Sequence, residues 1–306
     1  MRLEVKDIHK SFGETEILKG ISFSVENGKA LGLLGRNGAG KTTTIRVLMD
    51  VFHANSGELL LDGKRFDPRK IQIGYLPEER GLYPKREIME QMVYLARLRG
   101  ISKKQAVANS RRWLARLEVD QYAGKLLETL SKGNQQKVQL ASTLVCDPDI
   151  VILDEPFSGL DPVNSQILQE VVQELITGGK IVIFSSHQMS YVEEFCEDIV
   201  IINHGEVVLE GNLDEIKREF GENQLVISGV GMDAEAFGTM LVKDADDLVT
   251  ITGYSKEEVI VKLCEGVTRK QLFKALANIE GVEIEHFETY KPSLNDIFVA
   301  KVGEEA

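Results

Sequence analysis

The feature that most constrains the fold of this chain is a glycine-rich segment, Gly35-Arg-Asn-Gly-Ala-Gly-Lys-Thr42, which fits the pattern G-x-x-x-x-G-K-[ST]. The wholly apolar run Ala30–Leu34 precedes it, as expected for a buried parallel strand, and a helical pattern begins at Thr42. A strand, a glycine loop and a helix in this order direct backbone N–H groups and a helix N-terminus at one point, which favours phosphate. The segment therefore predicts an α/β fold with a phosphate-binding loop.

Two side chains carry the chemistry expected of this loop. We expect the Lys41 ammonium to reach the β- and γ-phosphates of a nucleotide and the Thr42 hydroxyl to hold Mg²⁺. The full set of loop residues predicted to contact the nucleotide is Gly35, Arg36, Asn37, Gly38, Ala39, Gly40, Lys41, Thr42 and Thr43.

An acidic pair, Asp154-Glu155, ends a second buried apolar run, Ile150–Leu153. Ligands of open α/β sheets bind at the carboxyl ends of the strands, so these acids are placed to act on a bound nucleotide. We expect Asp154 to hold the Mg²⁺ shell and Glu155 to be the general base for a water that attacks the γ-phosphate. Taken alone, the pair could be a solvated turn, but the glycine loop favours the catalytic interpretation.

A turn rich in Ser, Gly and Gln, Leu130-Ser-Lys-Gly-Asn-Gln-Gln-Lys137, opens a helix between the glycine loop and the acidic pair. The surrounding pattern from Lys85 to about Leu144 is helical, which indicates a helical lobe inserted into the α/β fold. A turn on a separate lobe cannot reach the nucleotide of its own chain. We therefore expect the 130–137 turn to form half of a site that a second molecule completes.

The remaining segments predict the domain organisation. With 306 residues the chain is long enough for two domains. The first strands alternate apolar and polar residues, which predicts an antiparallel start, and the character of the chain changes near Gly221. Beyond that point the pattern reads β-α-β-β-α-β, a split βαβ sandwich. We expect a first domain at 1–220, with a helical subdomain at about 85–145, and a small second domain at 221–306.

The order of the glycine loop, the 130–137 turn, Asp154-Glu155, Ser158–Asp161 and a later His187 resembles the ATP-binding subunit of an ATP-binding cassette (ABC) transporter. The resemblance covers residues 1 to about 220. It implies an α/β P-loop NTPase cassette with a RecA-like core, an antiparallel β subdomain and a helical subdomain. It also implies an ATPase activity, with ATP and Mg²⁺ as ligands.

The resemblance implies further roles for single residues. Phe12 matches the aromatic residue that stacks on adenine, and His187 matches the switch histidine that contacts the γ-phosphate. Asp161 matches the loop that lets paired sites communicate across an interface. The residues that match the grip on a partner's ATP are Ser131, Lys132, Gly133, Asn134 and Gln135. Outside this family pattern, Phe12 would be interpreted as a core residue and His187 as a structural one.

The 130–137 turn departs from the family pattern, which is usually Leu-Ser-Gly-Gly-Gln. Lys132 replaces the first Gly and Asn134 replaces the Gln, whereas the hydroxyl of Ser131 and the close-approach backbone of Gly133 are retained. Lys132 adds positive charge near a phosphate, so we expect the turn to keep its function.

A second departure follows the predicted strand Ile71–Leu76, where Glu78 stands at the position of a family Gln. That Gln contacts Mg²⁺ and relays the nucleotide state to the membrane subunit. A carboxylate can still ligate Mg²⁺ or a metal-bound water, and we expect Glu78 to do so with Thr42 and Asp154. Because Glu78 cannot donate a hydrogen bond as Gln does, we expect the coupling to be tuned differently.

The tail resembles the small C-terminal domain found on some ABC-2-type export ATPases. Lys291-Pro-Ser-Leu-Asn-Asp-Ile-Phe298 is similar to the closing motif of that domain. The resemblance implies a small α+β accessory domain and an exporter of the sodium-efflux or drug-efflux kind.

The charge and hydropathy of the sequence limit the kinds of partner that this chain is expected to bind. The net charge of −12 argues against binding to nucleic acid or anionic lipid. No apolar run approaches the roughly 20 residues that span a bilayer, and the charged start lacks the pattern of a signal peptide. We therefore expect a cytoplasmic protein, held at the membrane face by separate permease subunits, that works as a homodimer or heterodimer of cassettes.

Two other functions fit parts of the pattern. An ABC protein of ribosomes usually carries tandem cassettes, and one of chromosomes carries long coiled coils; this chain shows one cassette and no heptad arm. A regulatory module would bind ATP without hydrolysing it, but Glu155 and His187 are both present. A phosphate-release assay separates this last alternative from an ATPase.

Overall fold

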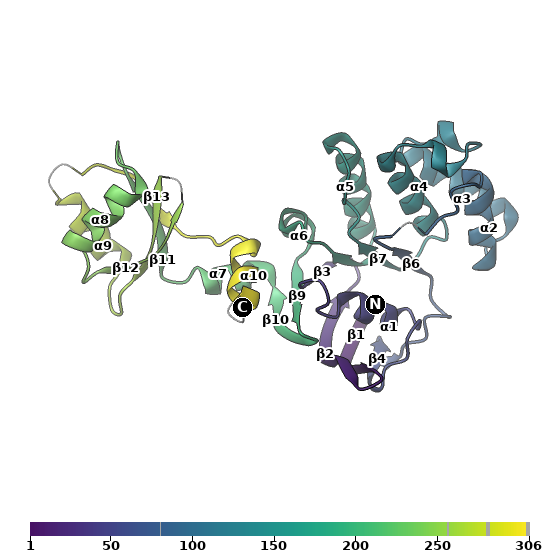
Figure 1. Ribbon diagram of the computed structural model, residues 1–306, viewed down its shortest axis with the longest axis horizontal. Coiled ribbons are helices and arrows are strands. Elements are labelled where there is room, and N and C mark those ends of the chain that lie inside the picture. The colour runs from purple at the N-terminus through teal and green to yellow at the C-terminus, as the bar shows by residue number, and fades with distance from the viewer. Residues whose placement is uncertain (80, 256, 280–281, 304–306) are drawn as a thin grey trace. The chain divides into compact units, whose positions relative to one another are not determined.

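The computed structural model describes residues 1–79, 81–255, 257–279 and 282–303, and Figure 1 traces the chain through its helices and strands. Contacts divide the chain into two compact units, Met1–Leu213 with the residues from Lys301, and Asp214–Ala300. Within the described ranges, none of the helices combines the length and apolar character that crossing a membrane requires.

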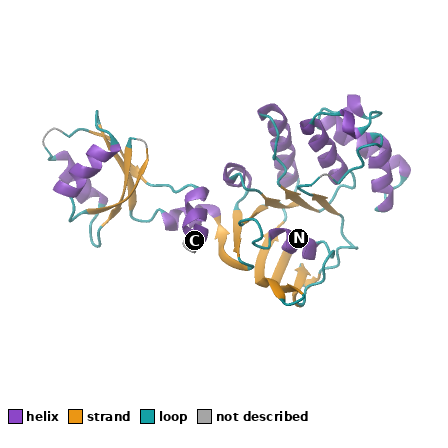
Figure 2. Ribbon diagram, viewed as in Figure 1, coloured by secondary structure: helices purple, strands orange, loops and turns teal. Residues whose placement is uncertain are grey.

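A six-stranded sheet forms the centre of the first unit (Figure 2). Its strand order is β10-β9-β3-β8-β7-β6, and every neighbouring pair is parallel except β10 with β9. The strands are β3 (Ala30–Leu34), β6 (Ile73–Leu76), β7 (Ile150–Asp154), β8 (Ile181–Ser185), β9 (Asp198–Asn203) and β10 (Glu206–Asn212). The predicted mostly parallel sheet is confirmed, although the strand predicted from Ile71 begins two residues later.

Every residue of β3, β7 and β8 is buried, because both faces of the sheet are covered. One face packs with α1 (Lys41–Leu48), and α5 (Pro162–Thr177) and α6 (Met189–Phe195) lie on the other side (Figure 1). The start of α5 is fixed by Asp161, whose side chain accepts from the Asn164 N–H, and by a proline in the first turn. This layering leaves the carboxyl ends of β3 and β7 at one edge, where the polar loops lie.

An antiparallel sheet of order β2-β1-β4-β5 packs against the other side of α1. Its strands are β1 (Arg2–Phe12), β2 (Thr15–Glu26), β4 (Ser56–Leu61) and β5 (Lys64–Arg65). Phe12 pairs with Thr15 across a tight turn, in which Gly13 has a positive φ of 61°. The predicted antiparallel start is confirmed, and the hairpin carries Phe12 to its tip.

The helical pattern from Lys85 to about Leu144 forms three α-helices and two short 3₁₀ turns. The helices are α2 (Ile88–Leu98), α3 (Lys103–Arg116) and α4 (Lys132–Leu144), with 3₁₀ turns at Asp120–Tyr122 and Leu127–Thr129. Serine caps start two of them, since Ser102 accepts from the Gln105 N–H and Ser131 accepts from the Asn134 N–H. Buried apolar side chains such as Met92, Leu114 and Val138 hold the helices together.

The second unit has its own core and its own sheet, of order β12-β13-β11-β14, in which all pairs are antiparallel. Its elements are α7 (Leu213–Phe220), β11 (Gln224–Gly229), α8 (Ala234–Asp244), β12 (Val249–Ser255), β13 (Glu258–Leu263), α9 (Arg269–Ala277), β14 (Ile284–Thr289) and α10 (Leu294–Gly303). From β11 to β14 the predicted order β-α-β-β-α-β is confirmed. Helices α7 and α10, which flank it, are additions to the predicted elements.

Candidate functional site

A cavity of about 640 Å³ lies over the loop between β3 and α1. It is lined by residues from the hairpin tip, the glycine loop, the loop after β6, the end of β7 and the loop after β8. These residues are Phe12, Ile17, Arg36, Asn37, Gly38, Gly40, Lys41, Thr42, Thr43, Glu78, Asp154, Glu155 and His187. The fold thus brings twelve of the residues predicted from the loop, acid and family motifs to one place, together with Ile17, which was not predicted.

Gly35 and Ala39 lie beneath the loop, buried, and do not line the cavity. Gly35 has a φ of 154°, and a Cβ atom there would stand 2.4 Å from the carbonyl oxygen of Ile202 in β9. A side chain at this position would push β3 and β9 apart, so glycine is required for the close approach of the two strands.

Lys41 is the first residue of α1 and only 9% exposed. Its Nζ donates to the carbonyl oxygens of Gly35 at 2.6 Å and Arg36 at 3.3 Å, so the ammonium lies inside the curve of the loop. Burial lowers the pKa of Lys41, and the nearby carboxylates of Glu155 and Asp154 oppose that shift. A buried cation among backbone N–H groups is suited to hold a polyanion.

Asp154 is held by two hydroxyl groups from neighbouring strands. Ser185 lies opposite it in the parallel register of β7 and β8, and the Ser185 hydroxyl donates to Oδ1. The Tyr75 hydroxyl from β6 lies 3.4 Å from Oδ2 and donates to it, while burial raises the pKa of Tyr75 to about 12. The two hydroxyl groups therefore fix the orientation of a carboxylate that lines the cavity.

Glu155 follows with a left-handed backbone, at a φ of 49°, which a non-glycine residue adopts only under constraint. Its Oε1 accepts from the His187 N–H at 2.7 Å, and its Oε2 accepts from the Ser186 hydroxyl at 3.2 Å. Burial raises the pKa of Glu155, with His187 acting in the opposite direction. A buried carboxylate with a raised pKa is a better proton acceptor near neutral pH than a solvated one.

The ring of His187 extends into solvent, with half of the side chain exposed. Its Nε2 lies 3.6 Å from Oε1 of Glu155, so the ring and the carboxylate border the same part of the cavity. The loop after β8 thus supplies a backbone donor that fixes Glu155 and a half-exposed imidazole that can contact a ligand.

Phe12 is 45% exposed, which excludes the core interpretation left open by the sequence. Its ring packs edge-on against Phe52 at 5.0 Å, and the Lys10 ammonium lies 5.1 Å from the ring centre. One face of an aromatic ring therefore remains available at the mouth of the cavity. Glu78, in the loop after β6, is also exposed and lines the cavity.

The 130–137 turn lies elsewhere, since its residues are not among those that line the cavity. Ser131 and Lys132 are exposed at the start of α4, while Gln135 is buried and donates to the Leu130 carbonyl at 2.9 Å. Asn134 is partly buried, and its N–H donates to the Ser131 hydroxyl at 3.4 Å. The structure therefore leaves the turn on the surface, away from the cavity of its own chain.

Asp161 lies beside this turn rather than in the cavity. It accepts from the Asn164 N–H at 3.0 Å and from its side-chain amide at 2.5 Å, and these bonds lower the pKa of Asp161. A Cβ atom on Gly133 would stand 2.7 Å from Nδ2 of the same Asn164. Asn164 therefore joins the start of α5 to the start of α4.

Sequence reasoning missed the part played by Tyr75. The signal was present, because a tyrosine stands next to last in a predicted strand that ends at the same sheet edge as Asp154. What the sequence could not supply is the strand order that places β6 next to β7.

Residues 18–158 match the family model described as "ABC transporter", and residues 211–302 match that described as "ATP-binding protein DrrA1-3-like, C-terminal domain". The chain is 40% identical over 305 residues to the uncharacterized ABC transporter ATP-binding protein YhaQ of Bacillus subtilis, covering 98% of each chain. It is 28% identical over 309 residues to Nod factor export ATP-binding protein I of Burkholderia orbicola, covering 99% of this chain and 97% of that one. A solved structure of an ATP-binding subunit of an ABC transporter matches 72% of this chain and 94% of its own, with 31% identity and a TM-score of 0.67.

Proposed function

The chain belongs to the ATP-binding proteins of ABC transporters and is an ATPase, and from this premise we propose that it drives an exporter as a dimer bound to separate permease subunits. Full-length similarity to a protein named for Nod factor export supports export. The match of the tail to the DrrA-like C-terminal domain supports the same direction. In this proposal residues 1–220 are the motor cassette and residues 221–306 are an accessory domain.

The observation that carries the proposal is the single cavity that unites Lys41 with Asp154, Glu155 and His187. A phosphate-holding loop after β3 and a buried, oriented carboxylate at the end of β7, two parallel strands on either side of β8, provide both halves of a phosphoryl-transfer site. Phe12 at the mouth is positioned to stack on adenine, while residues 35–43 surround the phosphates.

Three oxygen donors that line this cavity, from Thr42, Asp154 and Glu78, fit a magnesium ion. Among the described residues no cluster of three His, Cys, Asp or Glu side chains could hold a metal by itself. That agrees with the usual magnesium site, which uses one or two carboxylates together with substrate phosphates and waters. Bound there, Mg²⁺ would neutralise charge on the β- and γ-phosphates.

Hydrolysis in this proposal depends on Glu155 as the general base. A water on the γ-phosphate side gives its proton to the Glu155 carboxylate while its oxygen forms the new bond to phosphorus and ADP leaves. The His187 N–H fixes the carboxylate, and the imidazole contacts the γ-phosphate. Lys41 and the loop N–H groups stabilise the charge that develops on the phosphate oxygens.

The position of the 130–137 turn supports a dimer, because Ser131 through Gln135 do not line the cavity of their own chain and Ser131 and Lys132 are exposed. We propose that this turn grips the γ-phosphate of ATP bound to a second cassette, identical or closely related. Asp161, next to Asn164 at the same surface, then passes the state of one site to the other.

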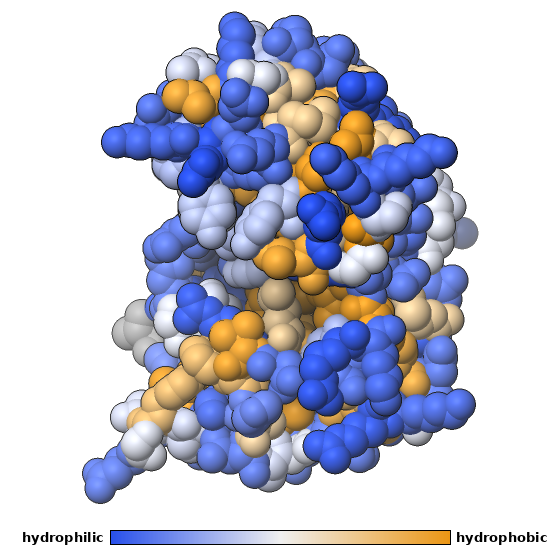
Figure 3. Space-filling model, turned by 90° about the vertical axis from the view of Figure 1, so that its right-hand side faces the viewer, coloured by the Kyte–Doolittle hydropathy of each residue, from blue (hydrophilic) through white to orange (hydrophobic). Residues whose placement is uncertain are grey.

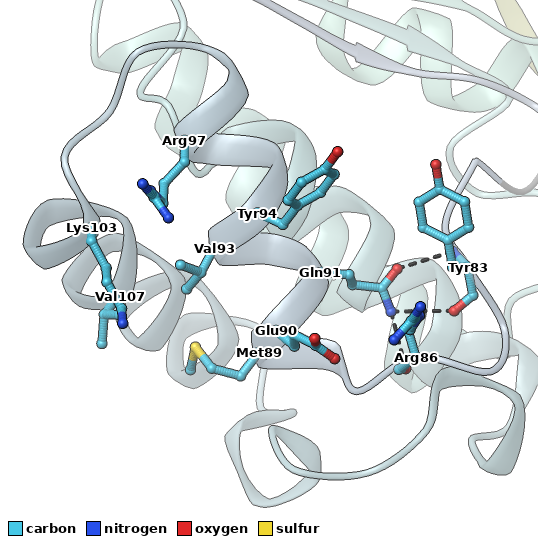
Figure 4. A pocket seen from close by; sticks show the side chains of 10 residues that line it. All are labelled: Tyr83, Arg86, Met89, Glu90, Gln91, Val93, Tyr94, Arg97, Lys103 and Val107. Carbon is cyan, nitrogen blue, oxygen red and sulfur yellow. Dashed lines mark hydrogen bonds between the residues drawn. The ribbon is translucent and has the colours of Figure 1, made fainter.

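A groove of about 710 Å³ on the helical lobe supports docking of a permease. Figure 3 views this side of the molecule and shows apolar surface gathered in and around a hollow. In Figure 4, Met89 and Val93 of α2 and Val107 of α3 face the groove, with Arg97 and Lys103 at its border. Since cations outnumber the acid Glu90 along the lining, the groove fits an apolar segment that carries acidic residues. Docking there would place the chain at the cytoplasmic face of the membrane.

Replacing Glu155 by Gln tests the proposal directly. The amide keeps the size of the side chain but cannot accept the proton, so we expect turnover to fall by roughly 10²- to 10⁴-fold while ATP binding is kept. Phosphate release and nucleotide binding are measured on the same preparation, and size-exclusion chromatography with ATP should show a longer-lived dimer.

The exposed Glu265→Gln substitution in the second unit is the matched control and should leave phosphate release unchanged. Normal turnover in the Glu155 variant would remove Glu155 from the role of base. A wild-type chain that binds ATP but releases no phosphate would favour a regulatory binding module instead.

A further inference from the structure

Three polar side chains on one face of α4 contact the backbone of β6 or of the loops that follow β6 and β7. Gln136, Gln139 and Thr143 are spaced by three and four residues, so they lie on the same side of the helix. Gln136 Nε2 donates to the Pro156 carbonyl at 3.1 Å, and Gln139 Nε2 donates to the carbonyls of Pro77 and Glu79 at 3.4 and 3.3 Å. The Thr143 hydroxyl donates to the Tyr75 carbonyl at 3.2 Å.

Each of the two glutamines meets a backbone next to an acid of the cavity. Pro156 directly follows Glu155, and Pro77 and Glu79 stand on either side of Glu78. These carbonyls lie beyond the last residues of β7 and β6, where the sheet ladder no longer fixes the backbone. Side-chain donors from α4 therefore set where the two acidic loops rest.

A movement of α4 can be passed to the loops through these hydrogen bonds, because the face of α4 that makes them is packed against the rest of the first unit. Gln139 is 6% exposed and Thr143 is 9% exposed, while Gln136 is partly buried. β6 is the edge strand of the sheet, and α4 covers that edge through Thr143. A shift of α4 would have to move the loops or break these bonds.

The other end of the same helix is the 130–137 turn, where Ser131 caps the first turn. Eight residues of helix separate Ser131 from Gln139, a length of about 12 Å at 1.5 Å per residue. A regular helix of this length moves as one body, so a ligand held at its start is linked to contacts made along its side.

We propose that Gln136 and Gln139 are positioning residues through which ATP of the partner cassette, gripped at Ser131, sets this chain's own Glu155 and Glu78. The inference rests on the proposed dimer. Binding in trans draws α4 toward the partner's nucleotide, and the two amides carry the loops with it. Each cassette then reaches its hydrolytic geometry only when the opposite site is filled.

Gln139→Met and Gln136→Met in the full chain test this coupling, because methionine keeps the length of the side chain and removes the donor. We expect ATP affinity of the dilute, monomeric protein to stay within about 2-fold, since the cavity residues are intact. The turnover number should fall about 10-fold, and the Hill coefficient for ATP should fall toward 1. If Gln136 and Gln139 had only a structural role, their replacement would not be expected to lower cooperative turnover while leaving ATP affinity unchanged.

Asn109→Leu is the matched control. Asn109 is another buried amide that donates to a carbonyl at α4, but at the far end, to Val145 at 2.7 Å. It should unfold at a lower temperature than wild type yet keep the turnover number and Hill coefficient within about 2-fold. If it lowers cooperative turnover as strongly as Gln139→Met does, general loosening of the helix explains the effect and the proposal is overturned.

A double-mutant cycle with Ser131→Ala tests whether the effect of Gln139 on turnover depends on Ser131. If Gln139 passes on what Ser131 binds, Gln139→Met should cost much less turnover in the Ser131→Ala background than in wild type. Equal fold-losses in both backgrounds would show independence and refute the coupling. If Gln139→Met fails to fold, the same cycle is carried by the partly buried Gln136.

Failure of this inference is distinguishable from failure of the proposed function. Cooperative wild-type hydrolysis together with wild-type behaviour of both glutamine variants would reject the coupling alone. No wild-type hydrolysis, or normal hydrolysis by Glu155→Gln, would reject the proposed function and the coupling with it.

Discussion

The two compact units both pair a sheet with helices, yet their buried chemistry differs. The first unit buries Lys41, Asp154 and Glu155, whereas the buried polar side chain of the described second unit is Ser228. Parallel strands deliver their carboxyl ends to one edge, so charged residues after β3 and β7 meet there. In the antiparallel sheet of the second unit, consecutive strand ends point in opposite directions and no such meeting occurs.

The second unit still carries a charged cavity, but of another kind. About 580 Å³ in volume, it is lined by residues that include Glu258, Glu285 and His286. His286 and Glu258 are both partly exposed and bonded to each other at 2.8 Å. Both units thus have a cavity, but among the described residues only the first unit buries residues of opposite charge together. That burial, rather than the presence of a cavity, distinguishes the catalytic unit.

The largest expected effect comes from removing the buried cation of the first unit. Lys41→Ala should lower ATP turnover by roughly 10²- to 10³-fold, because charge on the phosphate oxygens loses its stabilising partner. The comparison is Lys262→Ala, an exposed lysine of β13 in the second unit, which should leave turnover unchanged. Phosphate release measures both; equal losses in the two variants would break the distinction between the units.

A smaller effect, on stability, is expected when a glycine in each unit is replaced by alanine. Gly35→Ala places a methyl group 2.4 Å from the Ile202 carbonyl and should destabilise the first unit by about 1–3 kcal/mol or more. Gly253→Ala meets nothing closer than 3.6 Å, from Ile260, and should change stability by less than about 0.5 kcal/mol. Urea unfolding of the two variants provides the test, and a Gly35 variant as stable as wild type would contradict the close approach of β3 and β9.

The smallest effect concerns pH. The hydrogen bond that the protonated His286 ring donates to Glu258 raises the pKa of His286 above its usual 6.5, so this pair stabilises the second unit fully below pH 6.5. That contribution is lost as pH rises through the raised pKa. His286→Gln should therefore lower the urea midpoint in mildly acidic buffer and match wild type in alkaline buffer. A deficit that persists at alkaline pH would point to packing rather than charge.

Much of the fold and the site was predictable from local patterns, because strand ends and the glycine loop are short-range signals. Lys41, Asp154 and Glu155 follow from apolar runs that stop at polar residues, and the structure places all three in one cavity. The contacts of Tyr75 and Gln139 were not predictable, since each depends on which strand or loop lies beside it. Only the strand order and the packing of α4 decide that.

The boundary between the two parts of the chain also depends on packing. The sequence places the end of the first domain at residue 220, after α7, whereas contacts divide the chain after Leu213, the first residue of α7. Helix α7 is amphipathic, with Leu213 and Ile216 buried, and the sequence alone does not show which residues this apolar face packs against. Phe12 shows the same dependence on context, since only the tight hairpin turn reveals that its ring leaves the core.

The left-handed backbone of Glu155 has a consequence for how this enzyme can change. Asn and Gly tolerate a φ of 49° better than Glu does, so either would relax the turn. Substitution would also remove a buried carboxylate whose charged form is disfavoured. A laboratory selection for heat resistance alone should therefore replace Glu155 early and yield robust chains that no longer turn over ATP. At position 155 the residue that favours ATP turnover is therefore not the residue that favours stability, and the chain carries the one that favours turnover.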